Sequence, residues 1–164
     1  MTETPFFKKI AQVAVVVKDV HESAKKNWDN HGIGPWGIWT FDPSSVTDMT
    51  IRGKRVDYAM RVAIATIGDV MWELIEPLDE KSIYAEFLKE HGEGLHHVLF
   101  EVDDFDKTVS HFKDKGIEML QGGSWKGKIK YAYFDTRADL STISEIYTPP
   151  EKGEEFPPPE ATYP

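Results

Sequence analysis

Four polar side chains stand out because their types could hold a divalent cation. Gln12 and His97 each open a short apolar run, and Glu73 and Glu145 each come four residues before a proline. An imidazole, two carboxylates and an amide oxygen together suit a borderline or hard divalent ion such as Zn, Ni, Co, Mn or Mg. Four such donors leave coordination positions open for two oxygens of a substrate.

Each of these side chains also has an ordinary structural interpretation. Gln12 could bond a backbone group at a sheet edge, and the two glutamates could lie on solvated strand ends. His97 could be a core histidine with satisfied hydrogen bonds, beside an exposed His96. The occurrence of the four residues at matched positions favours a metal site over these alternatives.

The elements that must position these side chains occur twice along the chain. The β-branched run Ile10–Val17 predicts a buried strand, and Asp19 is placed to cap a helix that ends near His31. Residues 12–19 align with 97–104, and residues 73–77 align with 145–149, at offsets of 85 and 72 positions. Two aligned pairs in the same order indicate an internal repeat.

Each repeat is predicted to fold as βαβββ, which makes the chain an α+β protein. A loop is expected between the strands Ile38–Phe41 and Tyr58–Ile67, and a hairpin turn at Gly68 and Asp69. The other expected strands are Val70–Ile75, Leu95–Val102, Ile117–Leu120, Tyr131–Phe134 and Ile143–Tyr147, with a helix between Asp104 and Gly116. The predicted parts are a first module (9–78), a connector helix (79–94), a second module (95–149) and an extended, solvated, proline-rich acidic tail (150–164).

This repeat resembles the vicinal oxygen chelate superfamily of glyoxalases, methylmalonyl-CoA epimerases and bleomycin-resistance proteins. The stretch Glu73–Leu78 followed by Phe87–Asp104 is particularly similar to the epimerases. The resemblance implies a glyoxalase-like fold, in which two βαβββ modules form a U-shaped cup around one divalent metal ion, and a homodimer. It also implies that each module donates two metal ligands, which are Gln12 and Glu73 from the first and His97 and Glu145 from the second.

The resemblance implies an isomerase or epimerase that acts at a carbon next to a carbonyl group, similar to methylmalonyl-CoA epimerase. Non-haem iron oxygenases need two histidines and one carboxylate, so the single histidine argues against the dioxygenase branch. In Lewis-acid chemistry the metal polarises the carbonyl while a carboxylate removes and returns the proton. Glu73 and Glu145 come from different modules and could face opposite sides of an enolate, so both are expected to be catalytic.

Two other functions stay open. The set Gln, Glu, His, Glu is also that of animal-type glyoxalase I, a lactoylglutathione lyase, whereas epimerases more usually carry histidine at the position of Gln12. Bleomycin-resistance-type proteins bind aromatic ligands in the same cup without a metal. The tryptophans of this chain suit that second alternative, and the two matched glutamates count against it.

The expected substrate is a small acyl or carbonyl compound, with a CoA thioester among the candidates. Trp39 and Tyr131 are predicted to line the cup, while Trp72 should point away from the metal because it is adjacent to Glu73 on a strand. Lys126, Lys128 and Lys130 would share one face of an extended segment and could bind phosphates or carboxylates. Lys128 is therefore a candidate substrate-binding residue, the alternative being a solvated hairpin.

The amino-acid composition limits the classes of partner that we expect. Nineteen lysines and arginines against 28 acidic residues give a net charge of −9, which argues against a nucleic-acid partner. No apolar stretch is long enough to cross a membrane, and no secretory signal pattern is present. The absence of cysteine excludes disulfides and thiolate metal sites, and the expected location is the cytoplasm.

Overall fold

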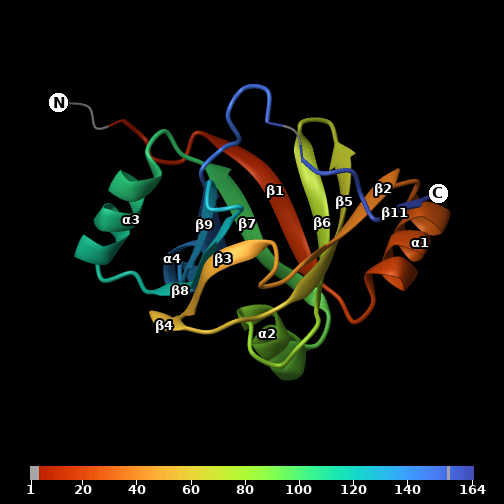
Figure 1. Ribbon diagram of the computed structural model, residues 1–164, viewed down its shortest axis with the longest axis horizontal. Coiled ribbons are helices and arrows are strands. Elements are labelled where there is room, and N and C mark those ends of the chain that lie inside the picture. The colour runs from red at the N-terminus through yellow and green to blue at the C-terminus, as the bar shows by residue number, and fades with distance from the viewer. Residues whose placement is uncertain (1–3, 155) are drawn as a thin grey trace.

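The computed structural model describes residues 4–154 and 156–164, which form an α+β cup (Figure 1). A single 11-stranded sheet curves through the molecule without closing, in the order β11-β2-β5-β6-β1-β7-β10-β9-β8-β3-β4. Its strands are β1 (Lys9–Val16), β2 (Trp36–Phe41), β3 (Val46–Ile51), β4 (Lys54–Arg55), β5 (Met60–Ile67), β6 (Val70–Pro77), β7 (Gly94–Glu101), β8 (Met119–Trp125), β9 (Ile129–Phe134), β10 (Ile143–Tyr147) and β11 (Ala161–Tyr163).

The register of the central strands has the symmetry of the repeat. β1 and β7 run antiparallel at the centre, and β6 and β10 pair parallel with their outer edges. Gln12 lies opposite Leu99, and His97 lies opposite Ala14, which is the counterpart of Leu99 in the repeat. Because both modules belong to one chain, the cup is formed within a single molecule.

Two helices cover the outside of the cup at opposite ends (Figure 1). α1 (Val20–His31) begins at the Asp19 cap, whose carboxylate accepts backbone hydrogen bonds, and ends at Gly32 in the left-handed conformation. It packs Val20 and Ala24 on the first module. α3 (Phe105–Asp114), capped by Asp104, packs Phe112 on the second. The shorter helices are α2 (Ile83–His91), which connects the modules, and α4 (Arg137–Leu140).

Residues 42–57, expected as a loop, contain two strands, so this prediction is wrong. β3 pairs antiparallel with β8 of the second module, and β4 pairs with β3. The segment is rich in Ser, Thr and Asp, and only Val46 and Met49 are buried in β3. It extends because β8 offers an unpaired edge, which local sequence cannot reveal. A hairpin of the first half therefore completes the wall of the second.

The C-terminal segment, residues 150–164, also differs from the expected solvated tail. It crosses from the β9–β10 side of the cup to the opposite side, where β11 pairs with β2 (Figure 1). Thr40 donates to the Glu160 carboxylate from both its backbone N–H and its hydroxyl. Prolines prevent regular structure before β11, yet side-chain contacts fix the segment to the cup.

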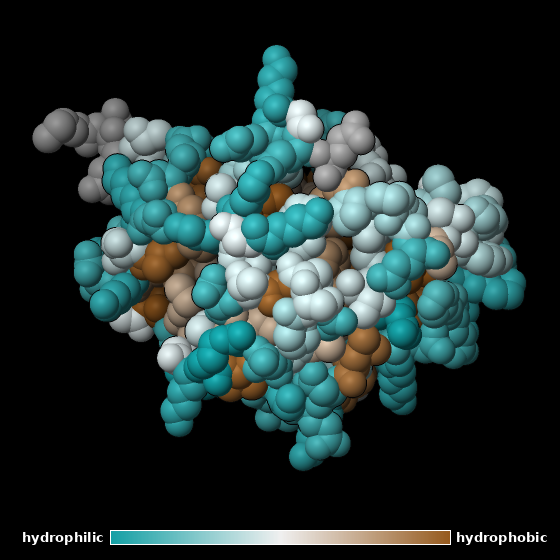
Figure 2. All heavy atoms as spheres, in the orientation of Figure 1, coloured by the Kyte–Doolittle hydropathy of each residue, from teal (hydrophilic) through white to brown (hydrophobic). Residues whose placement is uncertain are grey.

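The outer surface mixes hydrophilic side chains with separate hydrophobic patches on the face shown in Figure 2. The helices of the described residues are all too short or too polar to span a membrane. Inside the cup, a further cluster of buried residues packs between the two modules. It includes Val16, Met49, Tyr84 and Ile143. This inner group surrounds the polar residues described next.

Candidate metal centre

Four adjacent strands bring the predicted ligands together at the floor of the cup. Gln12 lies on β1, Glu73 on β6, His97 on β7 and Glu145 on β10, which are neighbours in the order β6-β1-β7-β10. Their exposures of 5%, 7%, 1% and 6% show that all four are withdrawn from water. Glu73 is opposite Ala14 and Glu145 is opposite Leu99, so the two modules place their glutamates equivalently. These four residues are called the floor below.

The imidazole of His97 stands between the two carboxylates. Its Nε2 lies 3.0 Å from Oε2 of Glu145 and 3.6 Å from Oε2 of Glu73. The amide of Gln12 acts on Glu73 in the direction that lowers the pKa of its carboxyl group. Two carboxylates, one imidazole and one amide thus converge from both modules, as the repeat predicted.

His96 contacts the other ring nitrogen of His97. The two Nδ1 atoms are 2.9 Å apart, so one donates a hydrogen bond to the other. If His97 donates, its Nε2 lone pair is left facing the carboxylates, which is the tautomer that binds a metal. The alternative with an exposed His96 is wrong because this ring is buried, 3% exposed, against Tyr84 and Phe87.

The pKa values on the floor depend on burial and on mutual charge. Burial raises the pKa of Glu73, and the nearby His97 only partly offsets this. Burial disfavours the charged form of His97, but the carboxylates of Glu145 and Glu73 outweigh it and raise the pKa of His97 to about 9. The floor without a metal therefore holds a proton on His97 at neutral pH.

The donor set fits a divalent cation. His97 Nε2 and Glu145 Oε2 are buried, and neither has a hydrogen bond of good geometry despite their proximity. These two atoms are 3.0 Å apart, so a proton on Nε2 pairs them in the metal-free protein, and a divalent ion could take the place of that proton. Within residues 4–154 and 156–164, no three His, Asp or Glu side chains stand where they could hold a metal ion without moving. The floor brings together four side chains of metal-ligand type, which would have to shift to bind an ion.

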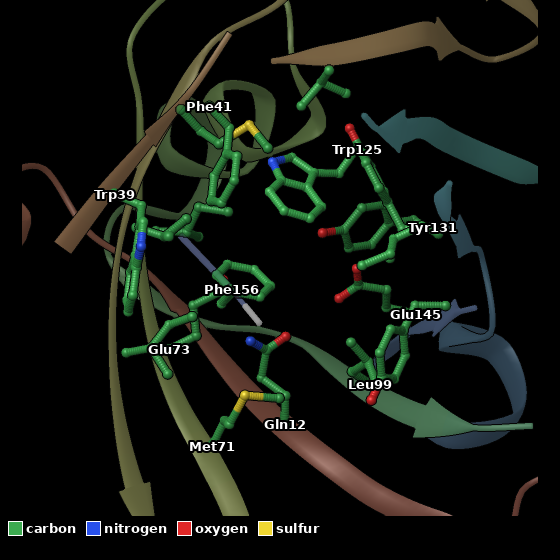
Figure 3. A pocket seen from close by; sticks show the side chains of 18 of the residues that line it. Gln12, Trp39, Phe41, Met71, Glu73, Leu99, Trp125, Tyr131, Glu145 and Phe156 are labelled. Carbon is green, nitrogen blue, oxygen red and sulfur yellow. The ribbon is translucent and has the colours of Figure 1, made fainter. Parts of the chain in front are cut away.

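A cavity of about 360 Å³ extends from the floor toward the opening of the cup (Figure 3). Glu73 and Glu145 lie on opposite sides of it, and both predicted lining residues, Trp39 and Tyr131, belong to its wall. Trp72 packs outside the cup with the residues beneath α1, as predicted. The wall is mostly apolar and aromatic.

The tyrosine hydroxyls of the wall satisfy one another. The Tyr58 hydroxyl donates to the carbonyl oxygen of Gly122 at 3.1 Å and lies 2.6 Å from the Tyr131 hydroxyl, which must therefore donate to it. Tyr84 donates to the Tyr133 hydroxyl at 2.7 Å. Burial raises the pKa of Tyr131, so this side chain stays neutral. Near the floor, Glu145 retains an unsatisfied oxygen.

Lys128 lies outside the cavity wall. Its Nζ is 2.8 Å from Glu154 of the C-terminal segment. The expected row of lysines does not form because residues 126–128 make the turn between β8 and β9, with Lys126 at a φ of 49°. Lys126 lies over the Trp125 ring, and Lys130 pairs with Asp106. The three ammonium groups therefore have separate partners.

Apart from Trp39, the sequence analysis did not predict which aromatic residues line the opening. Trp125, Phe41 and Phe156 line the cavity together with Trp39, and these four are called the mouth below. Trp125 lies at the end of a strand that continues five residues beyond its predicted end at Leu120. Phe156 lies in the segment expected to be solvated. The one signal that could have found Phe156 is a large aromatic within an acidic, proline-rich stretch.

Comparisons with known proteins agree with this geometry. The family model described as glyoxalase/bleomycin resistance protein/dioxygenase superfamily matches residues 11–133. The mitochondrial methylmalonyl-CoA epimerase of Bos taurus is 35% identical over 65 residues, 39% of this chain and 37% of that protein. A 4-hydroxyphenylpyruvate dioxygenase of Legionella pneumophila is 31% identical over 81 residues, 49% of this chain and 23% of the dioxygenase.

The solved structures share the fold over a greater length. A methylmalonyl-CoA epimerase of Streptomyces coelicolor, in complex with 2-nitronate-propionyl-CoA, superposes with a TM-score of 0.68. The alignment covers 91% of this chain and 99% of the epimerase at 18% sequence identity. By contrast, the chain spans less than a quarter of the length of the dioxygenase and little more than a third of the bovine epimerase.

Proposed function

Because the chain belongs to the glyoxalase/bleomycin resistance protein/dioxygenase superfamily, we propose that it is a divalent-metal-dependent isomerase or epimerase. The proposed reaction is proton transfer at a carbon next to a carbonyl group. The observation that carries this proposal is the pair of buried glutamates on opposite sides of one cavity, with a single imidazole between their strands. Such a pair can serve a planar carbanion from both faces.

Gln12, Glu73, His97 and Glu145 would hold the metal. A divalent ion bound there would polarise a substrate carbonyl and lower the pKa of the adjacent C–H group. Zn, Ni, Co, Mn and Mg are all candidate ions, because each accepts nitrogen and oxygen ligands. His96 would hold the His97 ring in orientation through the contact between their Nδ1 atoms.

Glu73 and Glu145 are the proposed proton acceptors. Because both are also proposed metal ligands, the glutamate that acts as base would first loosen from the ion. In an epimerisation, one glutamate removes the proton from one face and the other returns a proton to the opposite face. In a 1,2-shift, a single glutamate moves the proton between neighbouring atoms. The dry wall above them keeps water from competing for the carbanion.

The relatives support an epimerase-like reaction and make a CoA thioester a candidate substrate. An epimerase with this fold binds methylmalonyl-CoA in its solved complex. A lactoylglutathione-lyase reaction remains the nearest alternative because Gln12 takes the place where epimerases more usually carry histidine. Both reactions share the proton transfer proposed here. They differ in the substrate, which a panel of thioesters and thiol hemiacetals would distinguish.

A second candidate function is the binding of an aromatic ligand without chemistry. The observation that favours it is the wall of the cavity, which contains Trp39, Phe41 and Trp125. The two buried glutamates beside His97 count against it, because a pure binding module gains nothing from buried charges.

Deuterium exchange tests the proposed reaction. The full chain, stripped of metal and then loaded with Zn, Co, Mn, Ni or Mg in turn, is incubated in D₂O with a panel of carbonyl substrates. We expect deuterium to enter the carbon next to the carbonyl only in the loaded protein, as measured by NMR. Equal exchange with and without metal, or none with any ion, would contradict the proposal, and aromatic-ligand binding that needs no metal would support the second candidate.

A further inference from the structure

The wall above the floor has no charged side chain that could bind a charged substrate group. Among the described residues that line the cavity, none is a lysine or arginine, and the two acidic ones are Glu73 and Glu145 on the floor. The hydroxyls of Tyr58 and Tyr131 are hydrogen-bonded to each other. An anionic group pointing from the floor toward the mouth would lose its water without gaining a cation.

The lysines that could have supplied charge are engaged elsewhere. Lys130 pairs with Asp106 outside the cup, and Lys128 pairs with Glu154. Lys126 lies over the ring of Trp125, with its Nζ 4.6 Å from the ring centroid. The β8–β9 turn therefore presents an aromatic surface to the cavity rather than an ammonium group.

Phe156 forms a roof over the cavity. Its ring stacks on Trp125 at 5.4 Å with 7° between the planes, and meets Trp39 edge-on at 5.7 Å. Phe41 contacts it edge-on as well, at 6.2 Å. Figure 3 shows Phe156 between the sides that carry Trp39 and Trp125. The ring spans the opening between the two modules.

Contacts on both sides of Phe156 hold the roof in place. Before it, Glu154 pairs with Lys128 at the β8–β9 turn of the second module. After it, the carbonyl oxygen of Pro157 accepts a hydrogen bond from Trp39 Nε1 at 2.8 Å, and Glu160 binds Thr40 of β2. Phe156 is itself 47% exposed, and its covered part contacts the rings of the mouth.

We propose that Phe156 is a specificity-determining residue, and that the cup takes a carbonyl compound whose group directed away from the floor is a flat, uncharged aromatic ring. This inference rests on the proposed function for the carbonyl end of the substrate. The ring would lie beneath Phe156 and against the walls of Trp39, Trp125 and Tyr131. Offset and edge-on contacts with several rings favour an aromatic group over an aliphatic one of equal volume.

The size of the cavity agrees with this class of substrate. A dry cavity of about 150 Å³ holds benzene in another protein. The volume of about 360 Å³ measured here leaves room for a ring together with a carbonyl-bearing arm that reaches the floor. A small aliphatic acyl group would leave most of the aromatic wall without contact.

Matched thioesters of N-acetylcysteamine test the inference. Phenylacetyl, cyclohexylacetyl and succinyl thioesters carry a flat ring, a puckered ring and a carboxylate at comparable positions. Their dissociation constants are measured by tryptophan fluorescence on the metal-loaded full chain, with deuterium exchange followed in parallel. Phe156→Ala and Phe156→Leu are compared with Leu140→Ala, since Leu140 is also 47% exposed but lies outside the cavity.

We expect the phenylacetyl thioester to bind at least tenfold more tightly than the succinyl one, a difference of about 1.4 kcal/mol. Phe156→Ala should weaken phenylacetyl binding about tenfold, Phe156→Leu should weaken it less, and Leu140→Ala should leave it unchanged. Metal content equal to wild type would show that both Phe156 variants fold with the floor intact. Preference for the succinyl thioester, or an aromatic preference that survives Phe156→Ala, would overturn the inference.

The two proposals fail in different ways. Exchange of the succinyl thioester without aromatic preference would keep the proposed reaction and overturn the role of Phe156. Selective aromatic binding that depends on Phe156 but leads to no exchange with any metal would support the ligand class and contradict the proposed reaction.

Discussion

The floor and the mouth of the cup are built by different parts of the chain. The floor comes from β1, β6, β7 and β10, which the repeat places in equivalent registers. The mouth draws Trp39 and Phe41 from β2, but Trp125 from the end of β8 and Phe156 from the C-terminal segment. No counterpart of Phe156 exists in the first module. The repeat therefore accounts for all four floor residues, whereas the mouth also uses Phe156, which lies outside the repeat.

The floor and the mouth also differ in polarity. The floor contains buried charged groups, with Nε2 of His97 between the carboxylates of Glu73 and Glu145. The mouth contains stacked rings whose polar atoms are already paired, such as Trp39 Nε1 with Pro157. Changes on the floor should therefore alter metal binding and turnover, whereas changes at the mouth should alter only affinity.

Loss of the central imidazole should have the largest effect. His97→Ala removes the single nitrogen ligand and leaves two buried carboxylates facing a void. We expect metal affinity to fall about a hundredfold or more and proton exchange to disappear. Thermal unfolding with and without Zn²⁺ measures this: the ion should raise the midpoint for wild type but not for the variant. His91→Ala, in an exposed position of α2, is the matched control.

Removal of one carboxylate should have the next largest effect. Glu145→Gln keeps the volume of the side chain and a ligand oxygen but removes the base. The rate of deuterium exchange should fall about 10²- to 10⁴-fold, the usual contribution of general base catalysis. Glu118→Gln, which changes an exposed glutamate, should exchange like wild type. Full turnover in Glu145→Gln would assign the base to Glu73 instead.

The pH dependence of stability should separate the floor from the rest of the molecule. His97 has a pKa of about 9 in the folded chain and about 6.5 when unfolded, so the folded state holds the proton more tightly. In the metal-free protein this stabilisation is complete below about pH 6.5 and is lost as the pH rises through 9. Denaturant unfolding between these limits should show a loss on the order of 3 kcal/mol.

His97→Gln provides the control for that titration, because it has no imidazole to titrate and should lack this fall. A wild-type curve parallel to the variant would contradict the charge arrangement of the floor. Zn²⁺ should bind more tightly as the pH rises over the same range, since the ion must displace the proton of His97.

The smallest predicted effect comes from the wall. Tyr131→Phe removes the hydroxyl that donates to Tyr58, while Tyr58 can still donate to Gly122. The free energy of unfolding should fall by about 1 kcal/mol, the value of one hydrogen bond. Metal content should not change, as measured by elemental analysis beside the unfolding curve. A loss of metal would mean that wall and floor are coupled.

The parts of the fold that follow local rules were predicted correctly. The cap at Asp19, the helix that follows Asp104 and the hairpin turn before β6 all depend on neighbouring residues. The repeat also predicted part of the tertiary structure, because it aligned Gln12 with His97 and Glu73 with Glu145 in the sequence. Convergence on one floor then followed from the register of the central strands.

The parts that failed depend on distant partners. β3 extends because it pairs with β8, some seventy residues later in the chain, at a bulge where Asp48 has a φ of 56°. Phe156 reaches the cavity because its segment is held by Lys128 and Trp39, not by any local preference. Lys128 was expected to bind substrate, and in the structure it pairs with Glu154 of this segment instead. Such contacts have no signature in composition or periodicity.

The central claim is that the floor binds one divalent metal ion, and metal content tests it most directly. The full chain, purified without an affinity tag and reconstituted with Zn²⁺, is analysed for bound metal beside His97→Ala and Phe156→Ala. We predict about one ion per chain for wild type and Phe156→Ala, and almost none for His97→Ala. No bound ion in wild type after reconstitution, or full occupancy in His97→Ala, would contradict the account.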